Sequence, residues 1–192
     1  MILESIVTTT NADGTMNVSP MGPWVENDLA EGFELRPWDT STTFANLQQR
    51  CFGVLHVTDD VLLFAQAAIG QLGKAPNHRP AQQNESAFIL SDACRWYEFE
   101  VSFVEASNPR KSIRCKTVAT GRQRDFFGFN RAKHAVIEAA ILATRIDFLP
   151  AGEIESQMPP LATIVSKTGG PQEVEAFAMI DQFINSGKPN SR

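Results

Sequence analysis

A run of capping-type residues between positions 39 and 43 is the part of the sequence best suited to binding chemistry. Asp39, Thr40, Ser41, Thr42 and Thr43 stand directly before the helix-compatible stretch FANLQQR. One such side chain is enough to cap a helix. Further hydroxyls, with the free N–H groups and positive dipole end of a helix start, suit a phosphate group. We therefore predict a phosphate site here, with an over-polar cap and surface loop as the alternative.

The segment SPMGP at 19–23 is the second feature that could serve a ligand. Pro20 and Pro23 have no N–H to give a sheet ladder, so we predict that this segment faces a flat ligand rather than another strand. Gly22 allows a close approach of the backbone, and the amides of Met21 and Gly22 could donate to ring heteroatoms. The alternative is an edge strand blunted against aggregation.

The two segments complement each other chemically. A phosphorylated planar cofactor needs an anion clamp at one end and a close backbone approach to its ring at the other. Arg36 lies just upstream of the hydroxyl run, and we predict that it closes the phosphate site with a charge-assisted contact.

Bulk composition limits the function classes. The chain has 192 residues, of which 43% are apolar and 20% charged, so it can bury a core. Seventeen Lys and Arg against 22 Asp and Glu give a net charge of −5, which argues against a nucleic-acid partner. The start of the sequence lacks a signal-peptide pattern, and no apolar run approaches the roughly 18 residues of a membrane span. We expect a cytoplasmic protein without a membrane partner.

The cysteines and histidines do not predict a metal site. Cys51, Cys94 and Cys115 are odd in number and far apart, which is typical of reduced thiols. The three histidines are not spaced as ligands, so we expect no metal. Cys51 and Cys94 are interpreted as small core residues and His56, at the end of an apolar strand, as a core histidine with its hydrogen bonds satisfied.

Up to residue 121 the sequence predicts antiparallel β-structure. A helix is expected from 61 to 70, capped by Asp59 and Asp60, and a polar loop from 71 to 86. Strand patterns cover residues 6–10, 32–38, 51–57, 96–106 and 111–121.

The stretch 96–106 alternates in polarity and is expected to form a regular strand. A turn at 107–110, Ser-Asn-Pro-Arg, connects it to its predicted partner strand. The alternation assigns Phe99, Val101 and Phe103 to one face, opposite Glu98, Glu100 and Ser102.

Beyond residue 121 the pattern becomes helical. The stretch NRAKHAVIEAAILATR begins with Asn130 as a helix cap, and the last predicted helix has Pro171 in its first turn and Gly187 past its end. We therefore divide the chain into a β-barrel domain, residues 1–121, and a C-terminal helical region, residues 122–192, packed on the barrel.

One face of the helix after Asn130 carries groups that could handle protons and bind acids. Arg131, Glu138 and Arg145 fall on this face, with His134 at its margin, and Arg131, His134 and Glu138 are the candidates for chemistry. At the mouth of a cofactor pocket the histidine could transfer protons while the arginine binds an acidic substrate. The alternative is a solvated face over an apolar stripe.

Four ordered motifs, ILESIVTT.N.DG..N.SPMGP, STTFANL, GVLHVTDD and GFNRAKHAVIEAAILATR, together resemble the DUF447 family. This family belongs to the flavin-reductase-like, FMN-binding split-barrel superfamily. The resemblance covers nearly the whole chain. It implies an α+β fold, an antiparallel split β-barrel of the FMN-binding type with a C-terminal helical appendage.

The resemblance also implies a homodimer that binds FMN near the subunit boundary. Carried over by position, it assigns two groups of cofactor-binding residues. They are Ser41, Thr42, Thr43 and Asn46 on the phosphate side, and Asn17, Ser19, Met21 and Gly22 on the ring side.

The function that follows is an FMN-binding protein acting as a flavin-dependent oxidoreductase on a small molecule that the sequence does not identify. One alternative is a non-catalytic flavin-binding or accessory protein, linked to tetrahydromethanopterin-type one-carbon metabolism. Another is a split barrel that has lost the flavin and serves as a scaffold. The sequence has no GxGxxG motif, so any nicotinamide electron donor is expected to bind transiently over the flavin.

Overall fold

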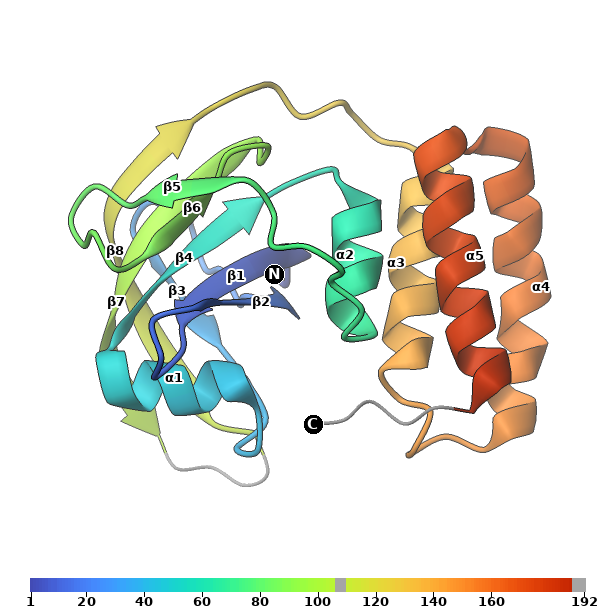
Figure 1. Cartoon of the computed structure of the whole chain (residues 1–192), viewed down its shortest axis with the longest axis horizontal. Helices are drawn as coiled ribbons and strands as arrows, with labels where there is room; N and C mark the ends of the chain where they lie inside the picture. Colours follow the sequence, from blue (N-terminus) through green and yellow to red (C-terminus); the bar gives the residue numbers. More distant parts are fainter. Residues whose placement is uncertain (106–109, 188–192) are drawn as a thin grey trace. The chain divides into compact units, whose positions relative to one another are not determined.

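A computed structural model of the chain describes residues 1–105 and 110–187 (Figure 1). Within these residues the chain forms eight strands and five helices. The strands are β1 (Ser5–Thr10), β2 (Met16–Met21), β3 (Gly32–Leu35), β4 (Phe52–Val57), β5 (His78–Pro80), β6 (Phe88–Leu90), β7 (Arg95–Glu105) and β8 (Ser112–Arg122). The helices are α1 (Thr42–Arg50), α2 (Val61–Ala68), α3 (Arg131–Ala143), α4 (Ala151–Thr168) and α5 (Pro171–Ser186).

Six strands form one antiparallel sheet in the order β2-β1-β4-β7-β8-β3. The two ends of this order meet through Trp24, which follows β2 and exchanges two backbone hydrogen bonds with Glu34 of β3, of 2.8 and 2.9 Å. The sheet therefore curls into a barrel, with β5 and β6 as a separate antiparallel pair. The predicted α+β class and antiparallel barrel are confirmed.

The barrel interior is filled by apolar side chains from most of its strands and from α1. Phe33 and Phe99 meet edge to face at a centroid distance of 5.2 Å. The buried cluster consists of Val7, Val25, Leu29, Phe33, Leu35, Phe44, Leu47, Leu55, Tyr97, Phe99, Ile113 and Cys115. This cluster supplies the hydrophobic driving force that closes the sheet.

His56 of β4 is fully buried, as the sequence predicts. The amide of Leu90 donates to its Nε2 at 3.0 Å, so the ring hydrogen is on Nδ1, which donates to the carbonyl of Ile6 at 3.2 Å. Cys94 is also buried as expected, but Cys51 is exposed. Cys51 ends α1 in the left-handed conformation with φ 57° and does not belong to the core, so the core assignment of this residue is wrong.

Two strand expectations need correction. The segment before Gly22 does pair with another strand, because all of β2 is in register with β1 and Pro20 stands opposite Ile6. At the end of the strand order, β2 tolerates a proline without breaking the ladder. The predicted loop at 71–86 contains the three-residue strand β5.

The strand β7 is less regular than its sequence predicts. Its pairing with β8 shifts between Glu98 and Phe99 and again between Val101 and Phe103. The first shift leaves Val118 of β8 without a partner and so keeps the alternation of β7, whereas the second inserts Ser102 of β7 and changes the face that Phe103 occupies. Phe103 is therefore 52% exposed. Glu98 is buried for a different reason, because its carboxylate accepts from the amides of residues 82–84. The turn predicted at 107–110 lies, apart from its last residue, outside the described residues.

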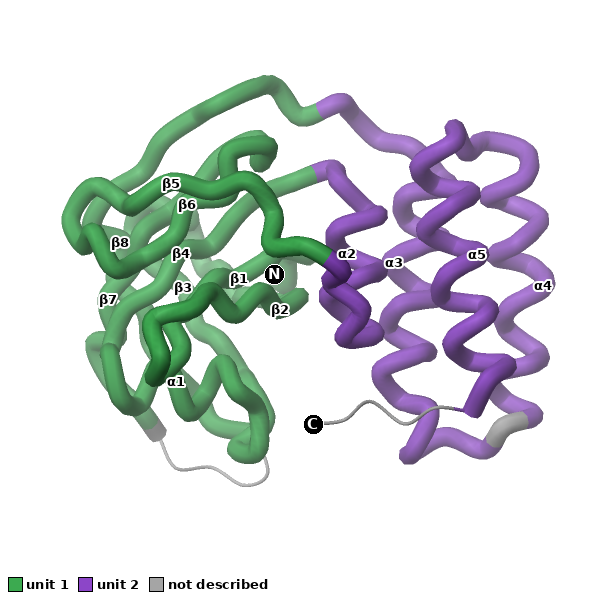
Figure 2. The backbone as a smooth tube through the Cα atoms, viewed as in Figure 1, with its two compact units in different colours: residues 1–58, 74–126, 192 green, residues 59–73, 127–191 purple. Residues whose placement is uncertain are grey.

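The chain divides into two compact units, which are shown in green and purple in Figure 2. The barrel unit contains residues 1–58 and 74–126, and so holds every strand named above together with α1. The helical unit contains residues 59–73 and, among the described residues, those from 127 onward. The helix α2 thus groups with α3, α4 and α5, although the sequence-based boundary at 121 assigns it to the barrel domain.

The helical unit follows its local sequence signals closely. Asn130 caps α3 by accepting a hydrogen bond from the Lys133 amide, and Asp60 caps α2 in the same way through the Leu63 amide. The start of α5 at Pro171 matches the prediction. The buried face of α3 is made mainly of alanine, and these short side chains allow the close packing of α3 against α2, α4 and α5.

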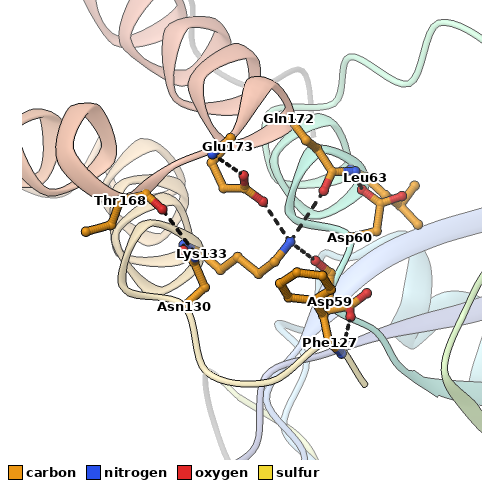
Figure 3. Close-up of polar contacts among 10 residues, drawn as sticks. Asp59, Asp60, Leu63, Phe127, Asn130, Lys133, Thr168, Gln172 and Glu173 are labelled. Atoms are coloured by element: carbon orange, nitrogen blue, oxygen red, sulfur yellow. Dashed lines mark hydrogen bonds and ion pairs between the residues drawn. The ribbon is translucent and has the colours of Figure 1, made fainter. Parts of the chain in front are cut away.

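A half-buried lysine connects three of these helices (Figure 3). Lys133 of α3 donates to the carbonyl of Asp59, just before α2, and to the carboxylate of Glu173 in α5, each at 2.7 Å. The Asp59 carboxylate accepts from the Phe127 amide at 2.6 Å. Residues 59 and 127 are the points where the chain enters the helical unit, so this network fixes both entry points to its core.

Candidate functional site

Three consecutive threonines at the end of β1 are polar and yet buried. Thr8, Thr9 and Thr10 are at most 2% exposed. Side chains alternate along a strand, so Thr8 and Thr10 share a face. Their hydroxyls donate to the carbonyls of Phe88 and Ser86, each at 2.6 Å. Thr9 lies on the opposite face of the strand and accepts two side-chain hydrogen bonds, from Asn17 at 3.1 Å and from Asn46 at 3.0 Å.

The start of α1 combines capping with free donors. Ser41 is the N-cap: its hydroxyl accepts from the Phe44 amide at 3.2 Å and donates to the Trp38 carbonyl at 2.7 Å. The amides of Thr42 and Thr43 come before the first carbonyl that the helix can pair with them. The first turn holds no acidic residue, so nothing in it neutralises the positive end of the helix dipole. Thr43 is buried, and Thr42 is exposed.

The hairpin β1–β2 and α1 meet through side-chain hydrogen bonds. Asn17 of β2 donates to the Thr43 hydroxyl of α1 at 3.2 Å as well as to Thr9. Asn46, one turn further along α1, donates to Thr9 and to the Asn11 side chain at 2.9 Å. We call Thr9, Asn11, Asn17, Thr43 and Asn46 the polar cluster. The cluster brings together Asn17, predicted on the ring side, and Thr43 and Asn46, predicted on the phosphate side.

Arg50 extends the contact between α1 and the hairpin. Its guanidinium donates to the carbonyls of Asn11 and Ala12 at 3.1 and 3.2 Å. Arg50, Thr9 and Asn11 were not among the residues predicted from the sequence. For Arg50 the signal was its position four residues after Asn46, on the same helix face. Thr9 carried no distinguishing signal, because threonine is typical of β-strands.

The other residues predicted on the ring side lie along or just after β2. The Met21 carbonyl accepts from the Ser5 hydroxyl at 2.8 Å, and the Met21 side chain packs against the barrel core. The Ser19 hydroxyl is within 3.5 Å of the Pro20 carbonyl. Gly22 is exposed and passes close to the N-terminal segment, since a Cβ there would lie 3.0 Å from the Ile2 side chain. Contact of these residues with a ring stays a prediction.

Arg36 has other partners than the polar cluster. It forms an ion pair with Glu34, two residues before it, and its guanidinium stacks over the ring of Trp24 at 5.2 Å from the centroid. Arg36 is exposed, so its side chain is held by surface contacts of modest energy. Its role in closing an anion site stays a prediction.

The predicted proton-handling residues belong to the helical unit. Arg131, His134 and Glu138 are exposed on α3, and the His134 ring stacks on Phe129 at a centroid distance of 6.1 Å. Their catalytic role is untested by these contacts. Among the described residues no group of three or more His, Cys, Asp and Glu side chains could hold a metal ion. None of the helices in the described ranges combines the length and apolar character that crossing a membrane requires.

Comparison with known proteins decides the family. The model of the N-terminal domain of DUF447, a family described as a protein of unknown function, matches residues 3–124. The model of its C-terminal part matches residues 130–182. The chain belongs to the DUF447 family. No curated protein matches this DUF447 chain.

Solved structures show where the DUF447 fold belongs. An FMN-bound DUF447 protein from Methanosarcina mazei superposes with a TM-score of 0.81 at 21% identity, over 95% of this chain and 94% of that one. The flavin reductase of styrene monooxygenase from Pseudomonas putida S12 superposes with a TM-score of 0.53 at 12% identity, over 63% of this chain and 81% of that one. The flavin reductase HpaC, complexed with NADP+, superposes with a TM-score of 0.54 at 14% identity, over 68% of this chain and 83% of that one. The predicted split β-barrel of the flavin-reductase type is confirmed.

Proposed function

We propose that this DUF447 protein binds FMN in its barrel unit and acts as a flavin-dependent oxidoreductase on a small molecule. The observation that carries the proposal is the hydrogen bond between Asn17 and Thr43, because it joins the two segments assigned to the two ends of the cofactor. The M. mazei relative was crystallised with FMN bound, and its fold extends over nearly the whole of this chain.

The donor chemistry of the site fits a phosphate monoester. The start of α1 presents the hydroxyls of Thr42 and Thr43 and the free amides of the first turn, with no carboxylate in that turn. Hydroxyl and amide donors around a helix start bind anions well, and the helix dipole adds to the attraction. Ser41, by contrast, uses its hydroxyl in the cap and would contribute through its position rather than as a phosphate donor.

FMN, when bound, supplies the redox chemistry, since its ring accepts and donates hydride or single electrons. The chain's own residues would bind and orient the FMN. Thr42, Thr43 and the first-turn amides would hold the phosphate, and the segment from Ser19 to Gly22 would contact the ring. We further propose that the protein is a cytoplasmic homodimer and that a nicotinamide nucleotide or another small reductant is the electron donor.

The test is the visible spectrum of the purified protein reconstituted with FMN. We expect flavin absorption that stays with the protein through gel filtration and is bleached by NADH or NADPH under anaerobic conditions, then restored by air. Colour that stays without bleaching by any tested reductant would favour a non-catalytic flavin-binding protein. A colourless protein after reconstitution would contradict FMN binding and leave the scaffold alternative.

A further inference from the structure

An exposed aspartate in the β1–β2 turn determines the direction of a hydrogen bond at the edge of the polar cluster. The Thr15 hydroxyl lies 2.7 Å from the Asp13 carboxylate, whose pKa is lowered mainly by its hydrogen bond from the Thr15 side chain. An ionised carboxylate only accepts, so the Thr15 hydroxyl donates to it. The lone pairs of Thr15 are then available to the side-chain NH₂ of Asn11, at 3.0 Å.

The direction of this hydrogen bond fixes the direction of the next ones, which lead to the helix α1. Because the NH₂ group of Asn11 donates to Thr15, its Oδ1 faces Asn46. Asn46 therefore faces Asn11 with Nδ2, at 2.9 Å, and gives its second N–H to the Thr9 hydroxyl at 3.0 Å. Both N–H groups of Asn46 are thus used inside the protein. Asn46 orients its neighbours and has only its Oδ1 left for further contacts.

Thr9 is the point where the contacts from α1 and β2 meet. Its oxygen accepts from Asn46 and from Asn17, which takes up both of its lone pairs. Asn17 gives its other N–H to the Thr43 hydroxyl. Within residues 1–105 and 110–187, the structure gives neither the Thr9 nor the Thr43 hydroxyl a hydrogen bond in which it is the donor. Both hydroxyls therefore keep one O–H to donate.

We infer that Thr9 is a positioning residue for the anion site, which acts through Asn17 to direct the Thr43 O–H toward a bound phosphate. Asp13 sets the direction of the contacts that converge on Thr9. This inference rests on the proposed FMN site and deepens it. The arrangement offers donors to a group that only accepts, so it selects the phosphorylated flavin over the unphosphorylated one.

The experiment compares FMN with riboflavin, which lacks the phosphate, by fluorescence titration of full-length wild type and variants. For Thr9→Val we expect the dissociation constant of FMN to rise about three- to tenfold, the range of one or two lost hydrogen bonds, with that of riboflavin changed less than about twofold. Thr9→Ser keeps the hydroxyl and is expected to retain the wild-type preference for FMN. Equal FMN affinity of wild type and Thr9→Val, or an equal loss for both flavins, would overturn the inference.

A second pair of variants tests the role of Asp13 in the β1–β2 turn without changing the buried Thr9. Asp13→Ala is expected to raise the dissociation constant of FMN about two- to fivefold without affecting riboflavin. Asp28→Ala is the matched control, because Asp28 is an exposed turn carboxylate of the same unit that accepts from the Ala30 amide, at 2.9 Å. Identical behaviour of the two variants would exclude the role of Asp13. If wild type itself binds no FMN, the proposed function fails, and this inference fails with it.

Discussion

Asn17 of β2 and Thr43 of α1 are 26 positions apart in the chain, and their side chains are joined by a hydrogen bond of 3.2 Å. The contact exists because β2 is in register with β1 and α1 lies against the same hairpin, held by Arg50 and Asn46. It brings an amide beside the free donors of a helix start. The proposed FMN site depends on this relationship.

Removing the hydroxyls at the start of α1 tests the phosphate contacts. For the double variant Thr42→Ala with Thr43→Ala we expect the FMN dissociation constant to rise at least about tenfold, because hydrogen bonds to a charged acceptor are lost. The circular dichroism spectrum should stay that of wild type. Thr163→Ala, an exposed helical threonine of α4, is the control and should bind FMN normally. Unchanged FMN affinity in the double variant would contradict the assignment.

The buried His56 predicts how stability depends on pH. Burial lowers its pKa to about 3, although its hydrogen bond to the Ile6 carbonyl raises it. In the unfolded chain this histidine titrates near its ordinary pKa of 6.5, whereas in the folded protein it stays neutral down to a pKa of about 3. The contribution of neutral His56 to the free energy of unfolding is therefore full above pH 6.5. It falls by about 1.4 kcal/mol per pH unit as the pH drops toward 3.

Urea denaturation at several pH values between about 7.5 and 4.5 measures this loss of unfolding free energy. His56→Gln offers one amide donor and one acceptor in place of the ring nitrogens, and it does not titrate. We expect the variant to show a slope smaller by about 1.4 kcal/mol per pH unit below 6.5. The same slope in both proteins would show that His56 does not cause the pH dependence.

The pair Lys133 and Glu173 makes the helical unit sensitive to a single change. Burial raises the pKa of Glu173, but hydrogen bonds from Lys133 and from the Gly170 amide lower it by more. Lys133→Met leaves this buried carboxylate without its cation and is expected to cost about 3 kcal/mol in unfolding free energy. Lys133→Met with Glu173→Gln should recover part of the loss.

The control for this pair is Lys167→Met, which removes an exposed lysine of α4. We expect its effect on the free energy of unfolding to stay within about 0.5 kcal/mol. A loss as small in Lys133→Met as in the control would show that the network of Figure 3 contributes little to stability.

Glu98 predicts local order in the segment between β5 and β6. Its buried carboxylate accepts from the backbone amides of Gln82, Gln83 and Asn84, at distances between 2.7 and 3.2 Å. For Glu98→Ala we expect a loss of about 2 to 4 kcal/mol and faster hydrogen exchange at these three amides, because they lose their acceptor. Glu100→Ala, at an exposed position of the same strand, should leave both unchanged.

Local signals in the sequence predict the helical unit well. Asn130, Asp60 and Pro171 mark helix starts through their own side chains, so no knowledge of the tertiary structure is needed. The alternation in β7 predicts too much regularity, because the pairing shift between Val101 and Phe103 depends on the partner strand β8. Exposure of Phe103 follows from this long-range feature and not from its own neighbours.

The site residues divide in the same way. The hydroxyl run before α1 and the polar residues of β2 are visible in the sequence as types. Their meeting depends on strand register and on the position of α1, which no local pattern encodes. Thr9 was missed for a related reason: a threonine in a strand is typical of β-structure, and only its burial and its two donors distinguish it.

The most direct test of the central claim is a crystal structure of the protein grown with FMN. We predict electron density for the phosphate within hydrogen-bond distance of the Thr43 hydroxyl and the first-turn amides of α1, with the ring along the segment from Ser19 to Gly22. Density for FMN elsewhere, with the start of α1 in contact only with water, would contradict the account.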